Sequence, residues 1–327
     1  MNSELSEMIK KDKSRNFVDQ DFYFCMSHVH NMEAKKIKQS MKQDLKKIKQ
    51  RNPELYNNIL ACYNTFLYWG KLVPEENIYE LIDNRVTMLK EHQDDFIWLY
   101  NRLEDYRSKK CLFGIVANWL TFDSELLRGL LDNAYKHYFD LDIINCGNDE
   151  VFVDLGAYIG DTIMDYIYSY SEYKKIYCYE INLAVFRRLQ SNLKNFHDIE
   201  LRRKGAARAD GYLYISDNEP NETTYKLLNK GKRKISVVAI DNDITEPVTF
   251  IKMDIEGGEQ EAIWGCQNHI RNTHPKLAIS VYHNNEDIWK CAHIIDKISP
   301  GYRFYLRYSG GDIYPSEYVL YAVFANQ

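Results

Sequence analysis

Two acidic residues that end short apolar runs are the side chains best placed to bind a ligand in this sequence. Asp154 lies in the run VFVDL at 151–155, and a glycine-bearing turn follows it, with a helix predicted to begin directly after the turn. Gly156 lets the backbone approach a ligand closely, and Gly160 permits tight packing at the helix start. The free N–H groups of a helix start can hold a carboxylate. The turn therefore predicts a ligand site made of Asp154, Gly156, Ala157, Tyr158, Gly160, Asp161 and Thr162.

The second acid, Glu180, ends the run IYCYE and follows Gly160 by 20 residues. A carboxylate at the end of a second strand can accept hydrogen bonds from both ribose hydroxyls of a nucleoside. The turn has the spacing G-x-x-x-G, so the pyrophosphate-binding pattern G-x-G-x-x-G is absent. An acid such as Asp154 is out of place beside phosphates, but it can accept from an ammonium group directly or through water. Each element alone is weak evidence, and together they predict S-adenosylmethionine as the cofactor.

Longer segments of the chain resemble the FkbM family of methyltransferases. The resemblance extends over the carboxy-terminal half in these segments: VFVDLGAYIGDT (151–162), YEIN (179–182), FIKMDIEGGEQEAIWG (250–265), KLAISVYH (276–283), DIW (287–289) and EYVLYA (317–322). It implies transfer of a methyl group from S-adenosylmethionine, generally to a hydroxyl oxygen. Many methyltransferases of this architecture place an acid after the third strand, near the adenine amino group, whereas this chain has KGAARAD at 204–210. The adenine contacts are therefore expected from the backbone around Ala206 and Ala207.

Two further strand ends carry groups that could act on a methyl acceptor, because ligands of doubly wound sheets bind at the carboxyl ends of the strands. Asp254 and Glu256 follow one predicted strand, and His283 follows the next. An alcohol acceptor must lose its proton, and His283 is the predicted base because imidazole titrates near neutral pH. Asp254 and Glu256 would orient the acceptor or accept the other N–H of His283. Asp254 is also expected to border the cofactor.

Other interpretations of these three residues stay open. A histidine at a strand end can simply donate to a backbone carbonyl, and Glu256, which precedes two glycines, can serve only as an acid at a helix start. The three side chains could also hold Mg²⁺ or Mn²⁺, which would polarise the acceptor oxygen. We expect no metal, and we assign His283 as the base.

The pattern of apolar residues changes near residue 145. From 1 to 145 apolar residues recur at helical spacing, which predicts a helical amino-terminal region. From 146 to 327 short apolar runs alternate with amphipathic ones, which predicts an α/β domain: a Rossmann-like, doubly wound, mostly parallel sheet with an antiparallel edge strand. The helices predicted before residue 145 lie at 33–51, with an apolar stripe at 37–48, and at 54–69, 75–91, 94–108 and 124–138. The predicted strands are 151–155, 176–180, 200–203, 212–215, 235–240, 249–253, 277–282, 303–308 and 318–324. Helices are predicted between them at 162–169, 183–195, 260–268 and 286–297.

The composition narrows the choice of partners and location. A hydrophobic fraction of 45%, a charged fraction of 27% and a net charge of −5 are typical of a globular protein and give no reason to expect nucleic acid as a partner. The 7 cysteines include no C-x-x-C pair, which argues against a disulfide framework or a zinc site. Neither a signal peptide nor a run of about 20 apolar residues is present, so we expect a cytoplasmic protein without a membrane span. The expected partner is a small-molecule or saccharide acceptor, and the sequence does not predict the oligomeric state.

Two other functions are weighed against methyl transfer. A nicotinamide-dependent oxidoreductase would use the same architecture, but the missing G-x-G-x-x-G turn counts against it. A catalytically silent module that assembles through residues 1–145 would have no need for the acids and glycines of a cofactor site. The sequence therefore favours an S-adenosylmethionine-dependent methyltransferase, with O-methylation of a sugar or small metabolite as the expected reaction.

Overall fold

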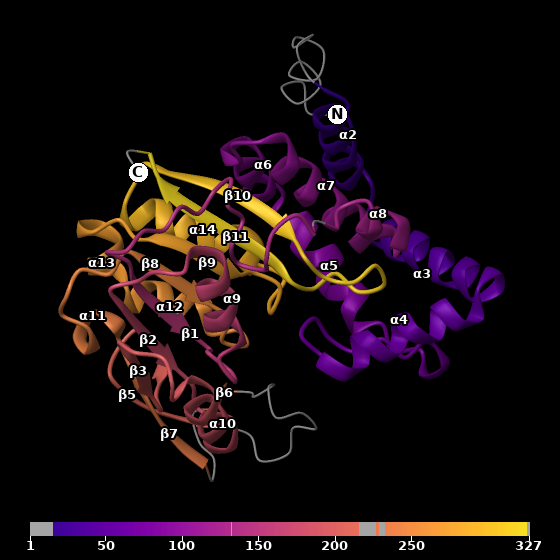
Figure 1. The fold of residues 1–327 in the computed structure, drawn as a ribbon. Coiled ribbons are helices and arrows are strands. Elements are labelled where there is room, and N and C mark those ends of the chain that lie inside the picture. The colour runs from indigo at the N-terminus through magenta and orange to yellow at the C-terminus, as the bar shows by residue number, and fades with distance from the viewer. Residues whose placement is uncertain (1–15, 132, 216–226, 229–232, 326–327) are drawn as a thin grey trace. The chain divides into compact units, whose positions relative to one another are not determined.

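The computed structural model describes residues 16–131, 133–215, 227–228 and 233–325 (Figure 1). These residues form two compact units. We call the first the helical unit, which comprises the described residues within 1–132, 282–289 and 305–318. The second, the sheet unit, comprises the described residues within 133–281, 290–304 and 319–327.

The helical unit is built from helices joined by short turns. They are α2 (Phe17–Asn31), α3 (Ala34–Arg51), α4 (Pro53–Phe66), the 3-10 helix η1 (Pro74–Glu76), α5 (Glu80–Glu91), α6 (Gln93–Arg102), α7 (Tyr106–Thr121) and α8 (Ser124–Arg128). The amphipathic spacing of α3 buries Ile37, Met41 and Leu45 on one face. Asn52 precedes Pro53 and begins α4 by accepting from the N–H of Leu55 at 3.0 Å. The predicted helical character of this region is thus present in the described residues.

Several predicted helices of this unit have different bounds in the structure. The helix predicted at 54–69 ends at Phe66. The helix predicted at 75–91 is interrupted between η1 and α5, where Asn77 has a φ of 57°. The helix predicted at 94–108 is divided, because the Asp105 side chain accepts from the N–H of Ser108 at 2.7 Å and begins a new helix, α7. The prediction of a helix at 124–138 was wrong in length. Its helix, α8, ends at Arg128 and is closed by Gly129, and residues 129–131 and 133–138 are not helical.

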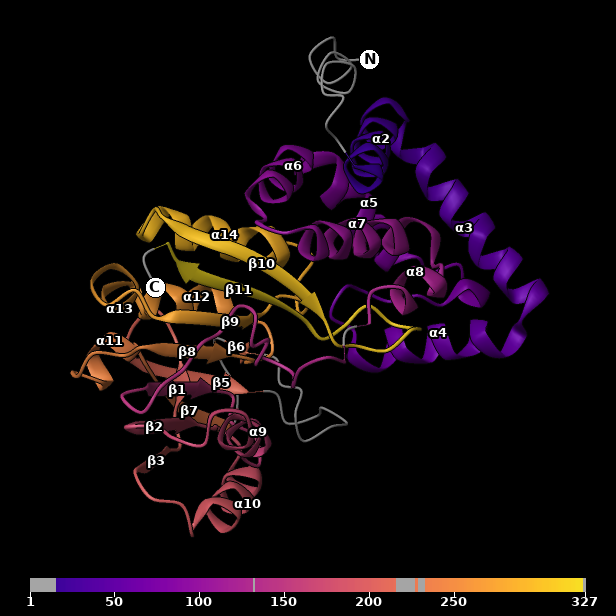
Figure 2. The ribbon, with the colours of Figure 1, turned by 45° about the horizontal axis from the view of Figure 1, so that its top comes forward.

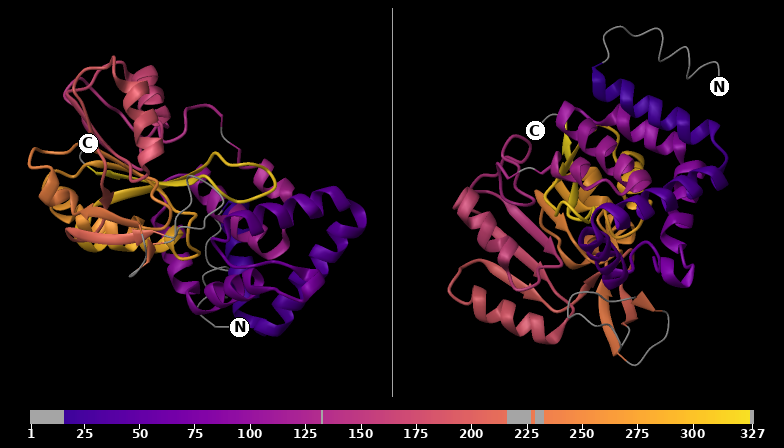
Figure 3. Two further views of the ribbon diagram at one scale, coloured as in Figure 1. Left: turned by 90° about the horizontal axis from the view of Figure 1, so that it is seen from below. Right: turned by 90° about the vertical axis from the view of Figure 1, so that its right-hand side faces the viewer.

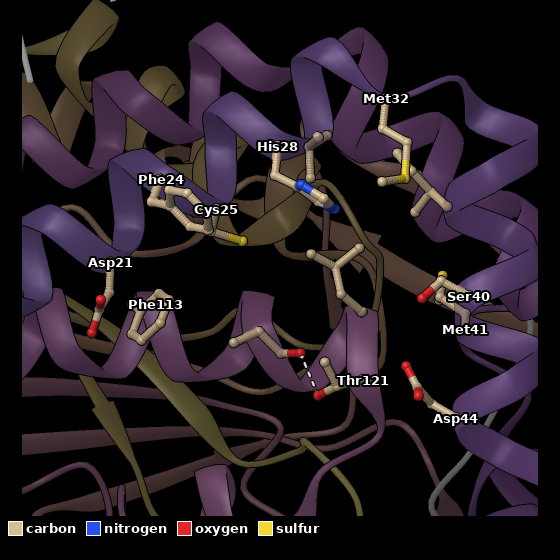
Figure 4. Close-up of a pocket in the computed structure, with 14 residues that line it drawn as sticks. Asp21, Phe24, Cys25, His28, Met32, Ser40, Met41, Asp44, Phe113 and Thr121 are labelled. Atoms are coloured by element: carbon tan, nitrogen blue, oxygen red, sulfur yellow. Dashed lines mark hydrogen bonds between the residues drawn. The ribbon is translucent and has the colours of Figure 1, made fainter. Parts of the chain in front are cut away.

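A pocket of about 380 Å³ lies among α2, α3 and α7 within the helical unit. Figure 4 shows Phe24 and Cys25 of α2 across from Phe113 of α7, with Met41 of α3 on a third side. Burial raises the pKa of the Cys25 thiol to about 11, so this thiol is protonated at neutral pH. No helix among the described residues is both long and apolar enough to cross a membrane.

The sheet unit is built on a seven-stranded sheet with the order β10-β11-β9-β8-β1-β2-β3, which can be followed from top to bottom in Figure 2. The bounds are β1 (Val151–Leu155), β2 (Lys175–Tyr179), β3 (Ile199–Arg202), β8 (Phe250–Met253), β9 (Lys276–Ser280), β10 (Tyr302–Tyr308) and β11 (Tyr318–Phe324). The strands from β9 through β8, β1 and β2 to β3 pair in parallel, and β11 pairs with β9 in the antiparallel sense. The predicted mostly parallel sheet with antiparallel carboxy-terminal strands is confirmed.

Helices cover both faces of this sheet (Figure 3). From β1 the chain moves one way through α9 (Asp161–Tyr170) and α10 (Leu183–Leu193). From β8 it moves the other way through α12 (Glu259–Gly265), α13 (Gln267–Asn272) and α14 (Asp287–Ile298). Right-handed crossovers in opposite directions place the two sets of helices on opposite faces. The direction changes between β1 and β8, and the carboxyl ends of strands at such a point are where doubly wound sheets bind ligands.

A second, four-stranded sheet has the order β4-β7-β5-β6. Its strands are β4 (Gly205–Ala206), β5 (Gly211–Ile215), β6 (Leu227–Leu228) and β7 (Arg233–Val238), and the short helix α11 (Ile240–Asp243) follows them. The strands predicted at 212–215 and 235–240 therefore exist, but they lie outside the main sheet. They pair with each other in the antiparallel sense, a connection that needs no crossover helix.

Candidate cofactor site

The glycine turn after β1 approaches the end of β8 very closely. Gly156 has a φ of 81°, and a Cβ atom there would lie 1.8 Å from the carbonyl oxygen of Asp254. Gly160 has a φ of 88°, and a Cβ atom would lie 3.0 Å from Leu193 of α10. Both glycines are therefore required by packing within the protein. For Gly156 the contact is with β8, where the sequence had suggested approach to a ligand.

Hydrogen bonds within the sheet unit fix the backbone of the turn. The N–H groups of Gly156 and Ala157 both donate to the carbonyl of Tyr179, at 3.0 and 2.9 Å, and the N–H of Gly160 donates to the carbonyl of Ala157 at 2.8 Å. The first helical bond of α9 runs from Met164 to Gly160. The N–H groups of Asp161 and Thr162 precede it, so they are the donors that this helix start offers to a ligand.

Glu180 lies directly beside the glycine turn. It follows β2, whose Tyr179 is the register partner of Leu155 on β1. The Glu180 carboxylate accepts from the N–H of Asn182 at 2.6 Å. Burial raises the pKa of Glu180 to about 7, and backbone N–H groups, including that of Tyr158, act in the opposite direction. The structure thus brings together Glu180 and the turn at one end of two neighbouring strands.

Asp154 is fully enclosed, with 0% of its surface exposed. Its register partner on β8 is Lys252, which is 1% exposed. The Lys252 ammonium lies 3.0 Å from Oδ1 of Asp154 and donates to the carbonyl of Gly156 at 2.8 Å. Burial lowers the pKa of Lys252, but the Asp154 and Asp254 carboxylates raise it by more, so the amine is charged.

Asp254, after β8, is held by a residue that precedes the sheet. The Tyr138 hydroxyl donates to Oδ2 of Asp254 at 2.9 Å and lies 3.0 Å from the Ser280 hydroxyl. The backbone of Tyr138 has a φ of 68°, which is rare for a residue with a side chain. The ring of His137 stacks on that of Tyr138 at 3.9 Å, and burial lowers the pKa of His137 to about 4. His137 is therefore neutral at physiological pH.

The turn between β8 and α12 separates two acids. Glu256, the predicted acid, is half-buried and has a φ of 59°. Glu259 is fully buried, and its Oε1 accepts from the N–H of Ile255 at 2.9 Å. Glu259 is thus the acid in the first turn of α12, the position that the sequence had left open for Glu256, and it binds the backbone of the preceding turn.

Ala206 and Ala207 lie at the start of the small sheet. Ala206 pairs with Val238, and the N–H of Ala207 donates to the carbonyl of Val238 at 2.9 Å. A Cβ atom at Gly265 of α12 would lie 2.0 Å from the Ala207 carbonyl oxygen. The donor of Ala207 is thus already used within the protein, and a role of these residues toward adenine stays a prediction.

His283 belongs to the helical unit, whereas Asp254 and Glu256 belong to the sheet unit. It is 2% exposed. Its ring lies 5.1 Å from that of Tyr68 and 4.2 Å from that of Tyr282. Nearby, the Asp287 carboxylate accepts from the backbone N–H of Asn284 at 3.0 Å, which orders the segment after β9. The joint action of His283 with the two acids stays a prediction.

Sequence reasoning missed Lys252, Tyr138 and Glu259. A lysine inside the apolar run FIKM is a signal that could have found Lys252, because a buried ammonium needs an acid partner. Glu259 carried a signal too, since it directly precedes the helix predicted at 260–268, where an acid is favoured by the helix dipole. Tyr138 carried none, because the pattern of 124–138 predicts a helix and the contact joins residues that are 116 apart in the sequence.

Comparison with known proteins identifies the architecture around this site. Residues 154–305 match the family model of the methyltransferase FkbM domain. The solved structure of methyltransferase FkbM from Methylobacillus flagellatus KT is 27% identical, with a TM-score of 0.62, over 73% of this chain and 61% of that chain. The chain contains an FkbM methyltransferase domain. S-adenosylmethionine is the methyl donor of this family, and the FkbM domain includes Glu180, Lys252 and His283.

More distant structures also match. An rRNA methylase from Streptococcus thermophilus is 12% identical with a TM-score of 0.37, over 63% of this chain and 95% of that chain. Fibrillarin from Aeropyrum pernix, solved with natively bound S-adenosyl-L-methionine, is 13% identical with a TM-score of 0.36, over 54% of this chain and 67% of that chain. No curated protein sequence matches significantly. The chain spans less than two thirds of the FkbM relative from Methylobacillus.

Proposed function

We propose that this protein binds S-adenosylmethionine and transfers its methyl group to a hydroxyl oxygen of a small-molecule or saccharide acceptor. One observation carries the cofactor part of the proposal. The glycine turn and Glu180 adjoin each other at the carboxyl ends of β1 and β2, inside the matched FkbM domain. This is the place where sheets of this kind bind nucleosides.

The residues of the site fit the parts of this cofactor. The N–H groups of Asp161 and Thr162 at the start of α9 suit its carboxylate. The Glu180 carboxylate suits the two ribose hydroxyls, which would replace the water lost when this acid is buried. Backbone atoms around Ala206 and Ala207 are assigned to adenine. The turn residues Ala157 and Tyr158 would line the site between these groups.

The proposed chemistry is a displacement in line with the bond that breaks. When bound, S-adenosylmethionine supplies a methyl group on a positively charged sulfur. His283 takes the proton of the acceptor hydroxyl while the new O–C bond forms and the S–C bond breaks. Asp254 and Glu256 orient the acceptor, and the proposal requires no metal. Alignment of the acceptor supplies much of the rate, and the base adds about 10²–10⁴-fold.

Binding of the cofactor tests the first half of the proposal. The free energy of unfolding should rise by about 2.7 kcal/mol when S-adenosylhomocysteine is present at about 100 times its dissociation constant. NAD⁺ under the same conditions should give no increase. A rise with NAD⁺ and none with S-adenosylhomocysteine would support an oxidoreductase instead. If neither ligand raises the free energy of unfolding, and the protein forms a stable complex through residues 1–145, a silent assembly module is supported.

Substitution of His283 tests the second half. With a hydroxyl acceptor found by screening sugars and metabolites for transfer of a labelled methyl group, His283→Ala should lower kcat by about 10²–10⁴-fold. The affinity for S-adenosylhomocysteine, measured by calorimetry, should be unchanged. His293→Ala, which changes a histidine of α14, is the control and should keep wild-type turnover. Wild-type turnover of His283→Ala with intact cofactor binding contradicts the assignment.

A further inference from the structure

Asp154 occupies the position from which the sequence predicted contact with the ammonium group of the cofactor. Its side chain has no exposed surface, and neither carboxylate oxygen is accessible. Among the described residues, Lys252 is the only side chain within ion-pair or hydrogen-bond distance of this carboxylate. A ligand cannot touch an oxygen that has no accessible surface unless the protein around it moves. The positive charge that Asp154 faces is therefore already part of the protein.

The ammonium group of Lys252 contacts three neighbours. It lies 3.0 Å from Asp154 Oδ1, donates to the Gly156 carbonyl at 2.8 Å, and stands 5.1 Å from the centre of the Tyr138 ring. The ammonium thus directs N–H donors to the Asp154 carboxylate and to the Gly156 carbonyl, and the Tyr138 ring lies within cation–π distance. Because β1 and β8 pair in parallel with Asp154 opposite Lys252, the contact is set by the register of the sheet.

The Gly156 carbonyl is one of several backbone atoms that fix the turn from different sides. Lys252 binds this carbonyl from β8, while the carbonyl of Tyr179 on β2 accepts from the N–H groups of Gly156 and Ala157. The backbone of Asp254 closes the third side, at 1.8 Å from where a Cβ atom of Gly156 would stand. The turn is thus held in place without any contribution from a ligand, and such preorganisation lowers the cost of binding.

We propose that Lys252 and Asp154 are a pair of positioning residues: Asp154 holds the Lys252 ammonium, which fixes the Gly156 carbonyl and with it the cofactor turn. Asp154 therefore acts through Lys252 and makes no contact with the ammonium group of the cofactor. The proposal deepens the proposed function and rests on it for the identity of the ligand. It concerns the described residues of the sheet unit alone.

Two ligands separate this role from direct contact. S-adenosylhomocysteine carries the amino-acid group, whereas methylthioadenosine has the same nucleoside and lacks that group. Lys252→Met should weaken the binding of both by about tenfold, because the turn loses its anchor. The ratio of their dissociation constants should stay within about threefold of the wild-type ratio in Lys252→Met, in Asp154→Asn and in the double variant. A ratio that changes by more than tenfold in Asp154→Asn, through loss of S-adenosylhomocysteine binding alone, overturns the proposal.

A matched control and a double variant keep the test interpretable. Lys276→Met removes a half-buried lysine that pairs with a buried acid, Glu150, at 2.8 Å, and it should leave both affinities unchanged. Lys252→Met should lower the melting temperature by leaving Asp154 without a partner, and the combination Asp154→Asn with Lys252→Met should recover most of it. If Lys252→Met binds both ligands as the wild type does, or if the double variant melts below Lys252→Met, the pair is not a positioning device.

Hydrogen exchange tests the same role in the absence of any ligand. In ligand-free Lys252→Met the amides of Gly156 and Ala157 should exchange faster than in the wild type, and in Lys276→Met they should not. Unchanged exchange in Lys252→Met counts against the proposal. This measurement stays decisive even if the wild type binds neither ligand, an outcome that would reject the proposed function instead.

Discussion

The two ends of β1 carry similar ion pairs that are built differently. Before the strand, Glu150 accepts from the Thr249 hydroxyl and from Lys276 at 2.8 Å. Near the end of the strand, Asp154 faces Lys252 at 3.0 Å and, within the described residues, accepts from no other group. The first pair is satisfied by several partners and is partly open to solvent at Lys276, which is 13% exposed. The second is enclosed and sparsely bonded.

This difference indicates that the two ion pairs have different roles, one in the stability of the sheet and the other at the ligand site. A carboxylate with full hydrogen bonding is what folding alone requires of a buried acid. A buried carboxylate with one partner costs stability, and such sites collect where a protein binds ligands. The carboxyl end of β1 is also where the glycine turn and Glu180 meet. We therefore infer that the Glu150–Lys276 pair stabilises the fold, and that the Asp154–Lys252 pair positions the cofactor turn.

The largest difference between the two ends of β1 should come from substitution of the glycine on each side, Gly147 and Gly156. Gly156→Ala combines a positive φ with a Cβ atom 1.8 Å from the Asp254 carbonyl, so it should lower the free energy of unfolding by more than about 4 kcal/mol. Gly147→Ala, before β1, meets only the Asp149 carboxylate at 3.3 Å and should change it by less than about 1 kcal/mol. Urea unfolding measures both. Equal losses would show that the two ends are packed alike.

The next largest effect should come from removing each lysine. Lys252→Met leaves a buried carboxylate without a partner and should lower the free energy of unfolding by about 3 kcal/mol. Lys276→Met should lower it by about 1 kcal/mol, because Glu150 keeps the Thr249 hydroxyl and the site is partly exposed. A greater loss in Lys276→Met than in Lys252→Met would reverse the comparison.

The smallest effect concerns Glu180 and pH. Burial raises the pKa of Glu180 to about 7, and the ionised carboxylate is the form that accepts from ribose hydroxyls. Binding of S-adenosylhomocysteine should therefore weaken by up to about tenfold as the pH falls from 8 to 6. Glu180→Gln should bind about tenfold more weakly at pH 8 and lose this pH dependence. Calorimetry measures the profile, and Glu172→Gln, an exposed acid after α9, should retain it.

Most of the main sheet could be predicted from the sequence, because each strand and helix is marked by a pattern of neighbouring residues. Short apolar runs and the helices between them located β1, β2, β8, β9 and the crossovers to within two residues at most ends. The run at 151–162 and the acid at 180 also predicted which strand ends would meet, since parallel strands bring their carboxyl ends together. The small sheet was not separated from the main one, because β5 and β7 have the same apolar pattern as parallel strands.

The contacts that complete the site could not be predicted in the same way. Lys252 faces Asp154 across 98 residues of sequence, and only the register of two strands brings them together. Tyr138 reaches Asp254 from a segment whose pattern resembles a helix until Gly129 ends it. The packing of Gly156 against the Asp254 carbonyl could not be predicted for a related reason, because no local signal shows that the residue after β8 lies against it.

The register that pairs Asp154 with Lys252 also constrains how this chain can evolve. A substitution of either residue alone leaves one buried charge without its partner, and the stability of the folded protein falls. Replacement of both by neutral residues of similar volume avoids that loss of stability, but it removes the hydrogen bond from Lys252 to the Gly156 carbonyl. Residues 154 and 252 are therefore expected to change together, if at all, in homologues that use this turn to bind a ligand.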